Sequence, residues 1–259
     1  MVRYGVLGWP VGHSRSPAMM RAAGLKDYQR LPVAPGAFDD TVRALGGGGF
    51  RGANVTIPHK QAALALATTA SEAAREIGAA NTLTFGPGGE IAADNTDAPG
   101  LLAALGGAPP ASAFVLGAGG SARAVVWALT RAGADVAVWN RTPERAEGLG
   151  ARVVTRPVCA EVLVNCTSVG LDHSSSPFKA LPLQADHLEE YATVVDLVYK
   201  VGGTELIREA GQRGIRTVDG LEILVRQGAL SFTLWTGLPA PLQAMRDAVR
   251  DTGLQTRAP

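Results

Sequence analysis

The sequence predicts an α/β protein built from two domains, and three observations support this prediction. The chain has 259 residues, enough for two ordinary domains that each bury a core. Short strand-like and helix-like runs alternate along both halves, as in proteins with mainly parallel sheets. A glycine- and proline-rich break at residues 107–112 precedes a second strand–turn–helix–strand run. We therefore expect one domain over residues 1–97 and another over residues 98–222.

The first half is predicted to begin with three strand–helix pairs. A hairpin should follow, because two β-prone runs flank the turn "GPGG" at Gly86–Gly89. A helix of about ten residues, "APGLLAALGG", then leads into the break. The expected strands are residues 4–7, 28–33 and 52–56, and the expected helices are about 17–23, 39–45 and 59–67.

The second half begins with a buried apolar strand, "AFVLG", which a glycine-rich turn, a helix and the strand "ADVAVW" follow. The segment "HSSSP" at His173–Pro177 is expected to be a plain loop. The segments "LEILVRQGALSFTLWTG" and "LQAMRDAVRDTG" are expected to form two amphipathic helices. Further strands are expected at residues 162–166, 194–198 and 217–218.

Composition favours a small-molecule ligand. Charged residues make up 18% of the chain and the net charge is +1, which gives no electrostatic reason to expect nucleic acid or an anionic membrane as partner. No apolar run approaches the roughly 18 residues that span a bilayer. The start "MVRYGVLGWPVGHS" is typical of a strand and loop, not of a signal peptide, so we expect a cytoplasmic protein.

Cysteines and histidines suggest neither redox chemistry nor a metal. Cys159 and Cys166 lack Cys-x-x-Cys spacing and nearby histidines, so buried thiols are expected. The four histidines are scattered without the spacing of metal ligands, and we predict no metal site.

The stretch "GAGGSA" at Gly117–Ala122 predicts a dinucleotide site. It fits the G-x-G-x-x-G/A pattern directly after a strand and at the start of a helix. In that pattern the glycines allow a tight turn and close approach of the backbone to a pyrophosphate, which the helix N-terminus attracts. A plain glycine turn is the alternative in a chain with 32 glycines, but the flanking elements favour a dinucleotide.

The end of the next strand predicts which dinucleotide binds. An NAD site would place Asp or Glu there, to accept a hydrogen bond from the ribose 2′-hydroxyl. The chain has "NRTPER": Asn140 leaves out that carboxylate, and Arg141, Thr142 and Arg145 offer donors to a 2′-phosphate. NADP is therefore the expected cofactor. A helix start with Thr142 as N-cap is also compatible with this stretch, although it does not explain Arg141.

A polar loop, "NCTSVG" at Asn165–Gly170, follows another buried strand of the same domain. Ligands of open α/β sheets lie at the carboxyl ends of strands. We therefore expect this loop, with Thr167 as its candidate contact, on the nicotinamide-ribose side. A simple turn-forming loop is the alternative interpretation.

Three polar clusters in the first half each follow an apparent strand: "GHSRSP", "NVTIPHK" and "NTL…DNTD". Together they offer hydroxyls, amides, a lysine and a carboxylate, which suit a small polyhydroxylated ligand. Simpler roles are open for some members, because Ser16–Pro17 has the pattern of an N-cap and first helical residue, and Asp97 could cap the next helix.

Lys60 is placed unusually for a basic residue. The proline before it is expected to open a helix, so the lysine falls in the first turn, where the helix dipole repels a cation. Lysine is also rare in the chain, which has only four among its 24 basic residues. This combination indicates a chemical role for Lys60.

The chain resembles the shikimate dehydrogenase family. The motifs are "HSRSP", "NVTIPHK", "GAANT", "NTDAPG", "GAGGSARA", "NRTPERA", "NCTSVG", "VVDLVY" and "DGLEILVRQGA", in family order from residue 5 to about 236. It departs from the family pattern at Met20, where histidine is usual, and in "YKVGGT", which lacks a proline. The resemblance implies NADP-dependent reduction of 3-dehydroshikimate to shikimate. It also implies an N-terminal substrate-binding domain, completed by C-terminal helices at about 223–259, and a Rossmann NADP-binding domain.

The resemblance also assigns individual residues. It makes Lys60 and Asp97 the catalytic pair. Substrate contacts are expected from Ser14, Ser16, Thr56, Asn81, Tyr199 and Gln227. Cofactor contacts are expected from Glu72, Gly117, Ala118, Gly119, Gly120, Ser121, Asn140, Arg141, Thr142, Arg145, Leu197 and Gly220.

Our mechanistic hypothesis is that Lys60 acts as acid and base while Asp97 orients it and binds a substrate hydroxyl. Three alternatives stay open: a quinate/shikimate dehydrogenase with broader substrate or cofactor use, a methylene-tetrahydrofolate dehydrogenase-like enzyme, and a non-catalytic NADPH-binding regulatory module. The second would not explain "HSRSP" together with "NTDAPG". A monomer or homodimer is expected.

Overall fold

The computed structural model describes residues 2–171 and 176–251, and the chain divides into two compact units. Unit 1 comprises residues 1–100 and 224–259, and unit 2 comprises residues 101–223. The loop expected at His173–Pro177 falls mostly outside the described residues. Unit 1 is therefore discontinuous, because its last segment follows the whole of unit 2 in the sequence.

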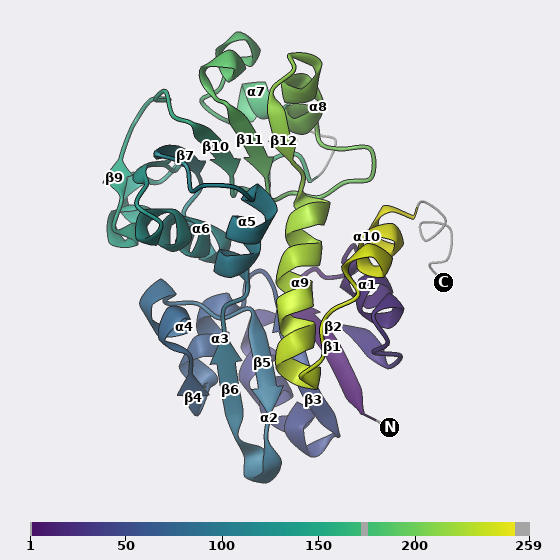
Figure 1. The fold of residues 1–259 in the computed structure, drawn as a ribbon. Helices are drawn as coiled ribbons and strands as arrows, with labels where there is room; N and C mark the ends of the chain where they lie inside the picture. The colour runs from purple at the N-terminus through teal and green to yellow at the C-terminus, as the bar shows by residue number, and fades with distance from the viewer. Residues whose placement is uncertain (1, 172–175, 252–259) are drawn as a thin grey trace. The chain divides into compact units, whose positions relative to one another are not determined.

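Unit 1 is built on a mixed sheet of six strands in the order β2-β1-β3-β5-β6-β4 (Figure 1). Strand β1 pairs in parallel with β2 and β3, and β4 pairs in parallel with β6. Only β5 runs antiparallel to its neighbours, β3 and β6, and the β5–β6 hairpin confirms the predicted turn. The strands are β1 Arg3–Gly8, β2 Tyr28–Pro32, β3 Phe50–Val55, β4 Thr69–Ala70, β5 Thr82–Phe85 and β6 Ile91–Asp94.

The helices of unit 1 follow the predicted pattern, with one helix added. The sequence prediction missed the short helix α4 and the two-residue strand β4, because α4 buries only Ala74 and Ile77 and shows little periodicity. The α-helices are α1 Ser16–Ala22, α2 Phe38–Gly47, α3 Lys60–Leu66, α4 Glu72–Ile77, the start of α5 Asp97–Leu105, most of α9 Gly220–Thr236, and α10 Leu242–Arg250. Short 3₁₀ turns occupy Pro35–Ala37 and Pro87–Gly89.

Different helices cover the two faces of the unit 1 sheet. Successive residues of a strand point to opposite faces, so Ala53 and Val55 of β3 join the core that α2 and α3 form around Phe38. Asn54 points the other way, and its Nδ2 donates to Ser231 Oγ of α9 at 2.9 Å. Helix α9 lies along this second face (Figure 1). The face under α9 is thus the one that carries buried polar groups.

Unit 2 is built on a parallel sheet of six strands in the order β12-β11-β10-β7-β8-β9. The order reverses between β7 and β10, as in doubly wound dinucleotide-binding folds. The strands are β7 Ser112–Leu116, β8 Asp135–Trp139, β9 Arg152–Val153, β10 Val162–Asn165, β11 Thr193–Asp196 and β12 Arg216–Val218. The α-helices are the rest of α5, α6 Gly120–Arg131, α7 Pro177–Ala180, α8 Glu205–Gln212 and the start of α9, with 3₁₀ turns at Pro143–Arg145, Glu147–Leu149 and Ala185–Glu190.

The prediction of two buried thiols is wrong. Cys159 is exposed and Cys166 is partly exposed, and neither forms a disulfide with a described residue. Cys159 Sγ lies 3.1 Å from Glu190 Oε2, and this hydrogen bond to a carboxylate raises the pKa of the thiol. The protonated form of Cys159 is therefore favoured, which makes the thiol a poor nucleophile.

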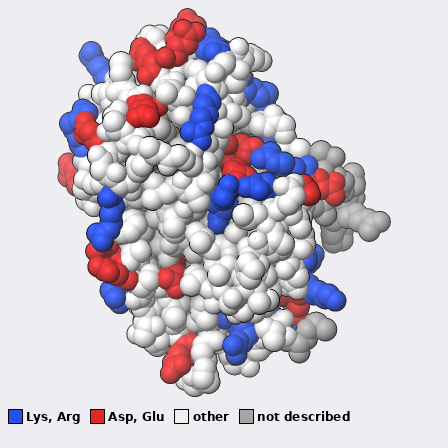
Figure 2. All heavy atoms as spheres, viewed as in Figure 1, with Lys and Arg blue, Asp and Glu red and all other residues white. Residues whose placement is uncertain are grey.

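The surface carries mixed charge. Figure 2 shows basic and acidic side chains spread over the viewed face with neutral surface among them. This distribution agrees with the net charge of +1. None of the helices within residues 2–171 and 176–251 is long and apolar enough to cross a membrane.

Replacing Gly52 by alanine should destabilise unit 1. A Cβ at this position would collide with the indole of Trp235, whose Nε1 donates to Leu83 O at 3.1 Å. Overpacking of this kind typically lowers the free energy of unfolding by about 1–3 kcal/mol, measurable by urea denaturation.

The matched control is Gly47→Ala near the end of α2. A Cβ there meets nothing within 4 Å, and alanine raises helix propensity by up to about 1 kcal/mol. Equal stability of Gly52→Ala and the wild type would contradict the close approach of α9 to β3.

Candidate active site

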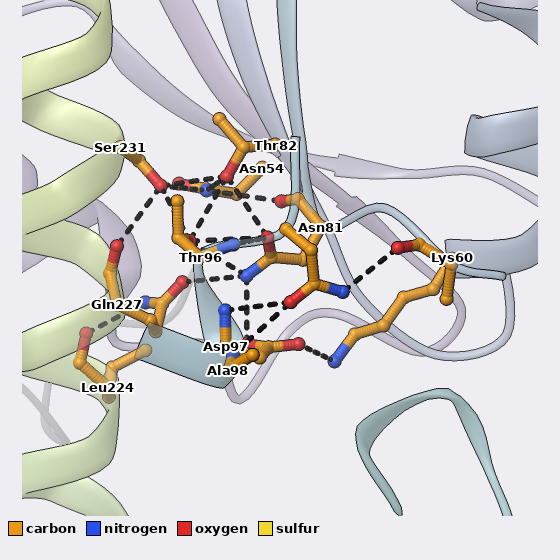
Figure 3. Close-up of polar contacts among 12 residues, drawn as sticks. Asn54, Lys60, Asn81, Thr82, Thr96, Asp97, Ala98, Leu224, Gln227 and Ser231 are labelled. Carbon is orange, nitrogen blue, oxygen red and sulfur yellow. Dashed lines mark hydrogen bonds and ion pairs between the residues drawn. The ribbon is translucent and has the colours of Figure 1, made fainter. Parts of the chain in front are cut away.

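Lys60 and Asp97 form a buried ion pair in unit 1. Lys60 Nζ donates to Asp97 Oδ2 at 2.7 Å, and their side chains are only 9% and 15% exposed (Figure 3). Lys60 is the first residue of α3 and Asp97 the first of α5. The helices follow β3 and β6, which run in the same direction, so both residues lie at one edge of the sheet.

The start of α3 differs slightly from the prediction. Strand β3 ends at Val55 and the helix begins at Lys60, so Pro58 lies in a turn and does not open the helix. The turn is closed by His59 N, which donates to Thr56 O at 2.9 Å. Lys60 still occupies the positive end of the helix dipole, and the carboxylate of Asp97 compensates that unfavourable position.

Asn95 supports the start of α5, so the expectation that Asp97 caps this helix is wrong. Asn95 Oδ1 accepts from Asp97 N at 3.1 Å and from Ala98 N at 3.2 Å. Its Nδ2 donates to Ala79 O at 2.9 Å. Because Asn95 takes the capping role, the carboxylate of Asp97 is available to other side chains.

Asn81 connects the ion pair to α9. Its side chain is 2% exposed, and its Nδ2 lies 2.8 Å from Asp97 Oδ1, 3.0 Å from Thr96 Oγ1 and 3.2 Å from Gln227 Oε1. Its Oδ1 accepts from Thr96 N at 2.7 Å, which fixes the orientation of the amide. An amide nitrogen has two hydrogens for these three acceptors, so Gln227, the most distant, holds the weakest of the three contacts.

A second layer of polar groups lies behind Asn81. Sequence reasoning included Asn54 and Thr82 in polar clusters without giving them a role, and it missed Tyr28 and Ser231. Asn54 Nδ2 donates to Ser231 Oγ, and Thr82 Oγ1 lies 2.9 Å from the same hydroxyl. Tyr28 OH donates to Asn54 Oδ1 at 2.8 Å. Ser231 follows Gln227 by four residues on α9, a spacing that places both on one helix face and could have signalled this layer.

The other predicted substrate residues of unit 1 lie on neighbouring loops at the same edge of the sheet. Ser14 and Ser16 are buried in the segment after β1, and Ser16 N donates to Ser14 Oγ at 3.3 Å. Thr56 N donates to Leu7 O at 2.8 Å, which holds the turn after β3 against the end of β1. The prediction of Ser16 as N-cap is wrong, because α1 begins at Ser16 with Arg15 at the N-cap.

Two further predicted residues belong to other segments of the chain. Glu72 is the exposed first residue of α4 in unit 1, and Tyr199 belongs to the segment after β11 in unit 2. The contacts predicted for them with cofactor and substrate stay predictions.

The glycine turn of unit 2 has the shape that a pyrophosphate site needs. Gly117 follows β7 with φ +106°, which favours glycine, and a Cβ there would lie 3.2 Å from Thr167 Cγ2. Gly119 is the N-cap of α6, and no side chain of the described residues caps that helix. A Cβ on Gly119 would meet nothing within 4 Å, so the space over the helix N-terminus is open. Backbone N–H groups of this kind bind phosphate oxygens, and the turn therefore fits a dinucleotide.

The loop after β8 presents two arginines. Arg141 and Arg145 are exposed, and Asn140 Nδ2 donates to Thr142 O at 2.7 Å, which shapes the loop. Thr142 is the N-cap residue of the 3₁₀ turn Pro143–Arg145, as the alternative interpretation expected, but its side chain makes no capping hydrogen bond. The two arginines of this loop suit a phosphate on the adenosine ribose.

Two other expected cofactor residues are brought together at the ends of β11 and β12. Gly220 begins α9, and a Cβ on it would lie 2.8 Å from Leu197 O. Among the described residues, no three His, Cys, Asp or Glu side chains gather as metal ligands would.

The two units together define a class of protein. A doubly wound unit with a glycine-rich turn, joined to an α/β unit that carries a buried lysine–carboxylate pair, is the architecture of a two-domain dehydrogenase.

Comparison with known proteins shows which family this is. The family model described as the shikimate dehydrogenase substrate binding domain matches residues 6–83, and the one described as the shikimate 5′-dehydrogenase C-terminal domain matches residues 220–250. A shikimate dehydrogenase (NADP⁺) of Thermus thermophilus is 46% identical, over 96% of this chain and 98% of the relative. The chain belongs to the shikimate dehydrogenase family.

Solved structures agree on the fold. The shikimate 5-dehydrogenase of another Thermus thermophilus strain, in complex with NADP(H) and shikimate, is 42% identical with a TM-score of 0.84, and the match covers 96% of this chain and 99% of that one. The 5-ketofructose reductase of Gluconobacter sp. strain CHM43 is 29% identical with a TM-score of 0.81, and the match covers 96% and 97% of the two chains. The same fold therefore occurs in a reductase named for a different substrate.

Replacing Asn95 by alanine should lower the free energy of unfolding by about 1–3 kcal/mol, because it removes the cap of α5 and leaves the carbonyl of Ala79 without its donor. Asn95→Asp keeps the capping oxygen and should recover part of the loss. Urea denaturation measures both changes. An Asn95→Ala variant as stable as the wild type would contradict the role of Asn95.

Proposed function

We propose that this protein is an NADP-dependent shikimate dehydrogenase, which reversibly reduces 3-dehydroshikimate to shikimate in aromatic amino-acid biosynthesis. The observation that carries the proposal is the 2.7 Å ion pair between Lys60 and Asp97. In this pair Lys60 can donate a proton, and the neighbouring Asp97 can accept a hydrogen bond from a substrate hydroxyl. The chain is also 46% identical to a relative named for this activity.

The reaction requires a hydride at the carbonyl carbon and a proton at the carbonyl oxygen. NADPH, when bound, supplies the hydride. Lys60 donates the proton to the oxygen and takes it back in the reverse direction. An ammonium group carries three hydrogens, so Nζ can bond Asp97 and the substrate oxygen together. Asp97 holds Lys60 in place and accepts a hydrogen bond from a substrate hydroxyl.

The remaining polar residues of unit 1 bind and orient the ring. Asn81 fixes the carboxylate of Asp97 through its bond to Oδ1. The side-chain oxygen of Gln227 is the acceptor most easily given to a substrate hydroxyl, because its contact with Asn81 is the longest, at 3.2 Å. We assign the hydroxyls of Ser14, Ser16, Thr56 and Tyr199 to the substrate as well.

Unit 2 is proposed to hold the cofactor. The backbone from Gly117 to Ser121 and the N-terminus of α6 would bind the pyrophosphate. The loop Asn140–Arg145 would bind the 2′-phosphate through its arginines. Thr167, Leu197 and Gly220 would face the nicotinamide ribose. We keep Glu72 of unit 1 as a further candidate for the nicotinamide end.

Replacing Lys60 by alanine should lower kcat for shikimate oxidation by about 10²-fold or more while KM changes far less, because the lost group acts on the transferred proton. Steady-state assays with NADP⁺ measure both constants, and circular dichroism checks folding. Lys26→Ala removes an exposed lysine of the same unit and should match the wild type. A folded Lys60→Ala variant with near-normal kcat would exclude Lys60 as the acid and base.

Replacing Arg141 or Arg145 by alanine should lower kcat/KM for NADP⁺ by about tenfold each, since a hydrogen bond between charged groups contributes about 1.5 kcal/mol or more. The kcat/KM for NAD⁺ should stay the same, because NAD⁺ has no 2′-phosphate. Arg152→Ala is the control, because its guanidinium lies 3.7 Å from Asp135 elsewhere in unit 2. Equal losses with NADP⁺ and NAD⁺ would contradict 2′-phosphate recognition.

The same assay separates the alternative functions. A quinate/shikimate dehydrogenase would give comparable kcat/KM for quinate and shikimate, or for both cofactors. A regulatory module would bind NADPH in calorimetry and turn over neither substrate.

A further inference from the structure

Asp196 is a buried carboxylate that the mechanism above leaves without a role. It is the last residue of β11, in the segment "VVDLVY", and it is 1% exposed. Burial raises its pKa to about 6, against the lowering effect of hydrogen bonds from Thr204, Val198 and Asn165. At neutral pH it is therefore a buried charge, and no ion pair with a described residue compensates it. Such a charge usually destabilises a fold.

Three segments of unit 2 donate hydrogen bonds to this one carboxylate. Asn165 Nδ2, at the end of β10, donates to Oδ1 at 2.9 Å. Val198 N, in the segment after β11, donates to the same oxygen at 3.0 Å. Thr204 Oγ1, at the N-cap of α8, donates to Oδ2 at 2.6 Å. A carboxylate only accepts hydrogen bonds, so each partner must turn a donor toward it.

The hydrogen bond to Asp196 sets the orientation of the Asn165 amide, and this orientation in turn affects the glycine turn. Because Asn165 turns its Nδ2 toward Asp196, its Oδ1 faces Thr167 and accepts from Thr167 N at 3.0 Å and from Thr167 Oγ1 at 2.7 Å. The methyl group of Thr167 then lies against Gly117, where a Cβ would be 3.2 Å away. The orientation of one amide thus couples Asp196 to the loop after β10 and to the turn after β7.

The hydrogen bond from Val198 N to Asp196 fixes the backbone beside two other expected cofactor residues, Leu197 and Gly220. It fixes the backbone that follows Leu197, and Gly220 packs directly on it: a Cβ on Gly220 would lie 2.7 Å from Val198 O. Asp196 is therefore tied, directly or through one or two residues, to each of the four positions Gly117, Thr167, Leu197 and Gly220. These positions lie at the carboxyl ends of the strands, on both sides of the reversal in strand order.

We propose that Asp196 is a positioning residue of the cofactor site, which holds the loops after β10 and β11 in the arrangement that binds the nicotinamide half of NADP. This inference rests on the proposed function. Asp196 acts through Asn165, Val198 and Thr204 and does not touch the reacting atoms. Its loss should therefore weaken cofactor binding more than substrate binding, because Tyr199 is the one assigned substrate residue in the segments that Asp196 holds, and the others belong to unit 1.

The test is NADPH binding to the full chain, measured by calorimetry. Asp196→Ala should raise the Kd for NADPH about tenfold or more, and Thr204→Val, which removes one of the three bonds, about threefold. Thr204→Ser keeps the hydroxyl and should bind like the wild type. Thr193→Val is the matched control, because Thr193 is also buried on β11 but at its opposite end. In steady-state assays the KM for shikimate should rise less than the Kd for NADPH in Asp196→Ala and Thr204→Val, and should match the wild type in Thr193→Val.

The outcomes distinguish failure of the positioning role of Asp196 from failure of the proposed function. A folded Asp196→Ala or Thr204→Val variant with wild-type Kd for NADPH would overturn the positioning role and leave the proposed function intact. Equal rises in the Kd for NADPH and the KM for shikimate would also overturn it, since they would reflect general loss of structure. If Asp196→Ala does not fold, the comparison of Thr204→Val with Thr204→Ser decides. A wild-type protein that does not bind NADPH would overturn both.

Discussion

A lysine at the first position of a helix is paired with a buried carboxylate. The helix dipole opposes the charge of Lys60, and burial removes most of the water that would otherwise stabilise it. Asp97 offsets both effects from 2.7 Å away. A buried pair of this kind needs its remaining lone pairs satisfied, and Asn81 does so for the second oxygen of Asp97. The polar groups under α9 follow from that need, because Asn81 must itself be held in one orientation.

The sheet explains why these groups meet. Strands β3 and β6 run in one direction and deliver Lys60 and Asp97 at their carboxyl ends, whereas β5 runs in the opposite direction and delivers Asn81 just before its start. One antiparallel strand therefore brings a third segment to the same edge. In unit 2 the equivalent meeting of loops arises from the reversal of strand order between β7 and β10.

Much of this arrangement could be predicted from local patterns. The polar clusters after strands, the cation in a first helical turn and the glycine turn between strand and helix each have a short-range cause, and the sequence displays them. The misassigned caps show the limit of such patterns. Asp97 and Asn95 are both good capping residues, and the local sequence does not show that Asn95 caps α5 while Asp97 pairs with Lys60. Ser16 lies one residue past the N-cap of α1, and Thr142 is an N-cap whose side chain makes no capping hydrogen bond.

Other features depend on long-range packing and had no local signal. Asn54 and Ser231 are 177 positions apart, and their hydrogen bond exists only because α9 lies on the β3 face. Asp196 ends an apolar run in the way that many strands end, so its sequence context does not distinguish a buried acceptor of three hydrogen bonds from an ordinary exposed carboxylate.

The discontinuity of unit 1 has a consequence for the order in which the protein can fold during synthesis. Translation proceeds from the N-terminus, and domains generally fold as units while the chain emerges. Residues 1–100 are made first, yet the contacts Asn54–Ser231 and Asn81–Gln227 join partners 177 and 146 positions apart. All of unit 2 must leave the ribosome before α9 can cover the buried amides of the first segment. The nascent unit 1 therefore keeps one face of its sheet uncovered while the whole dinucleotide-binding unit is synthesised.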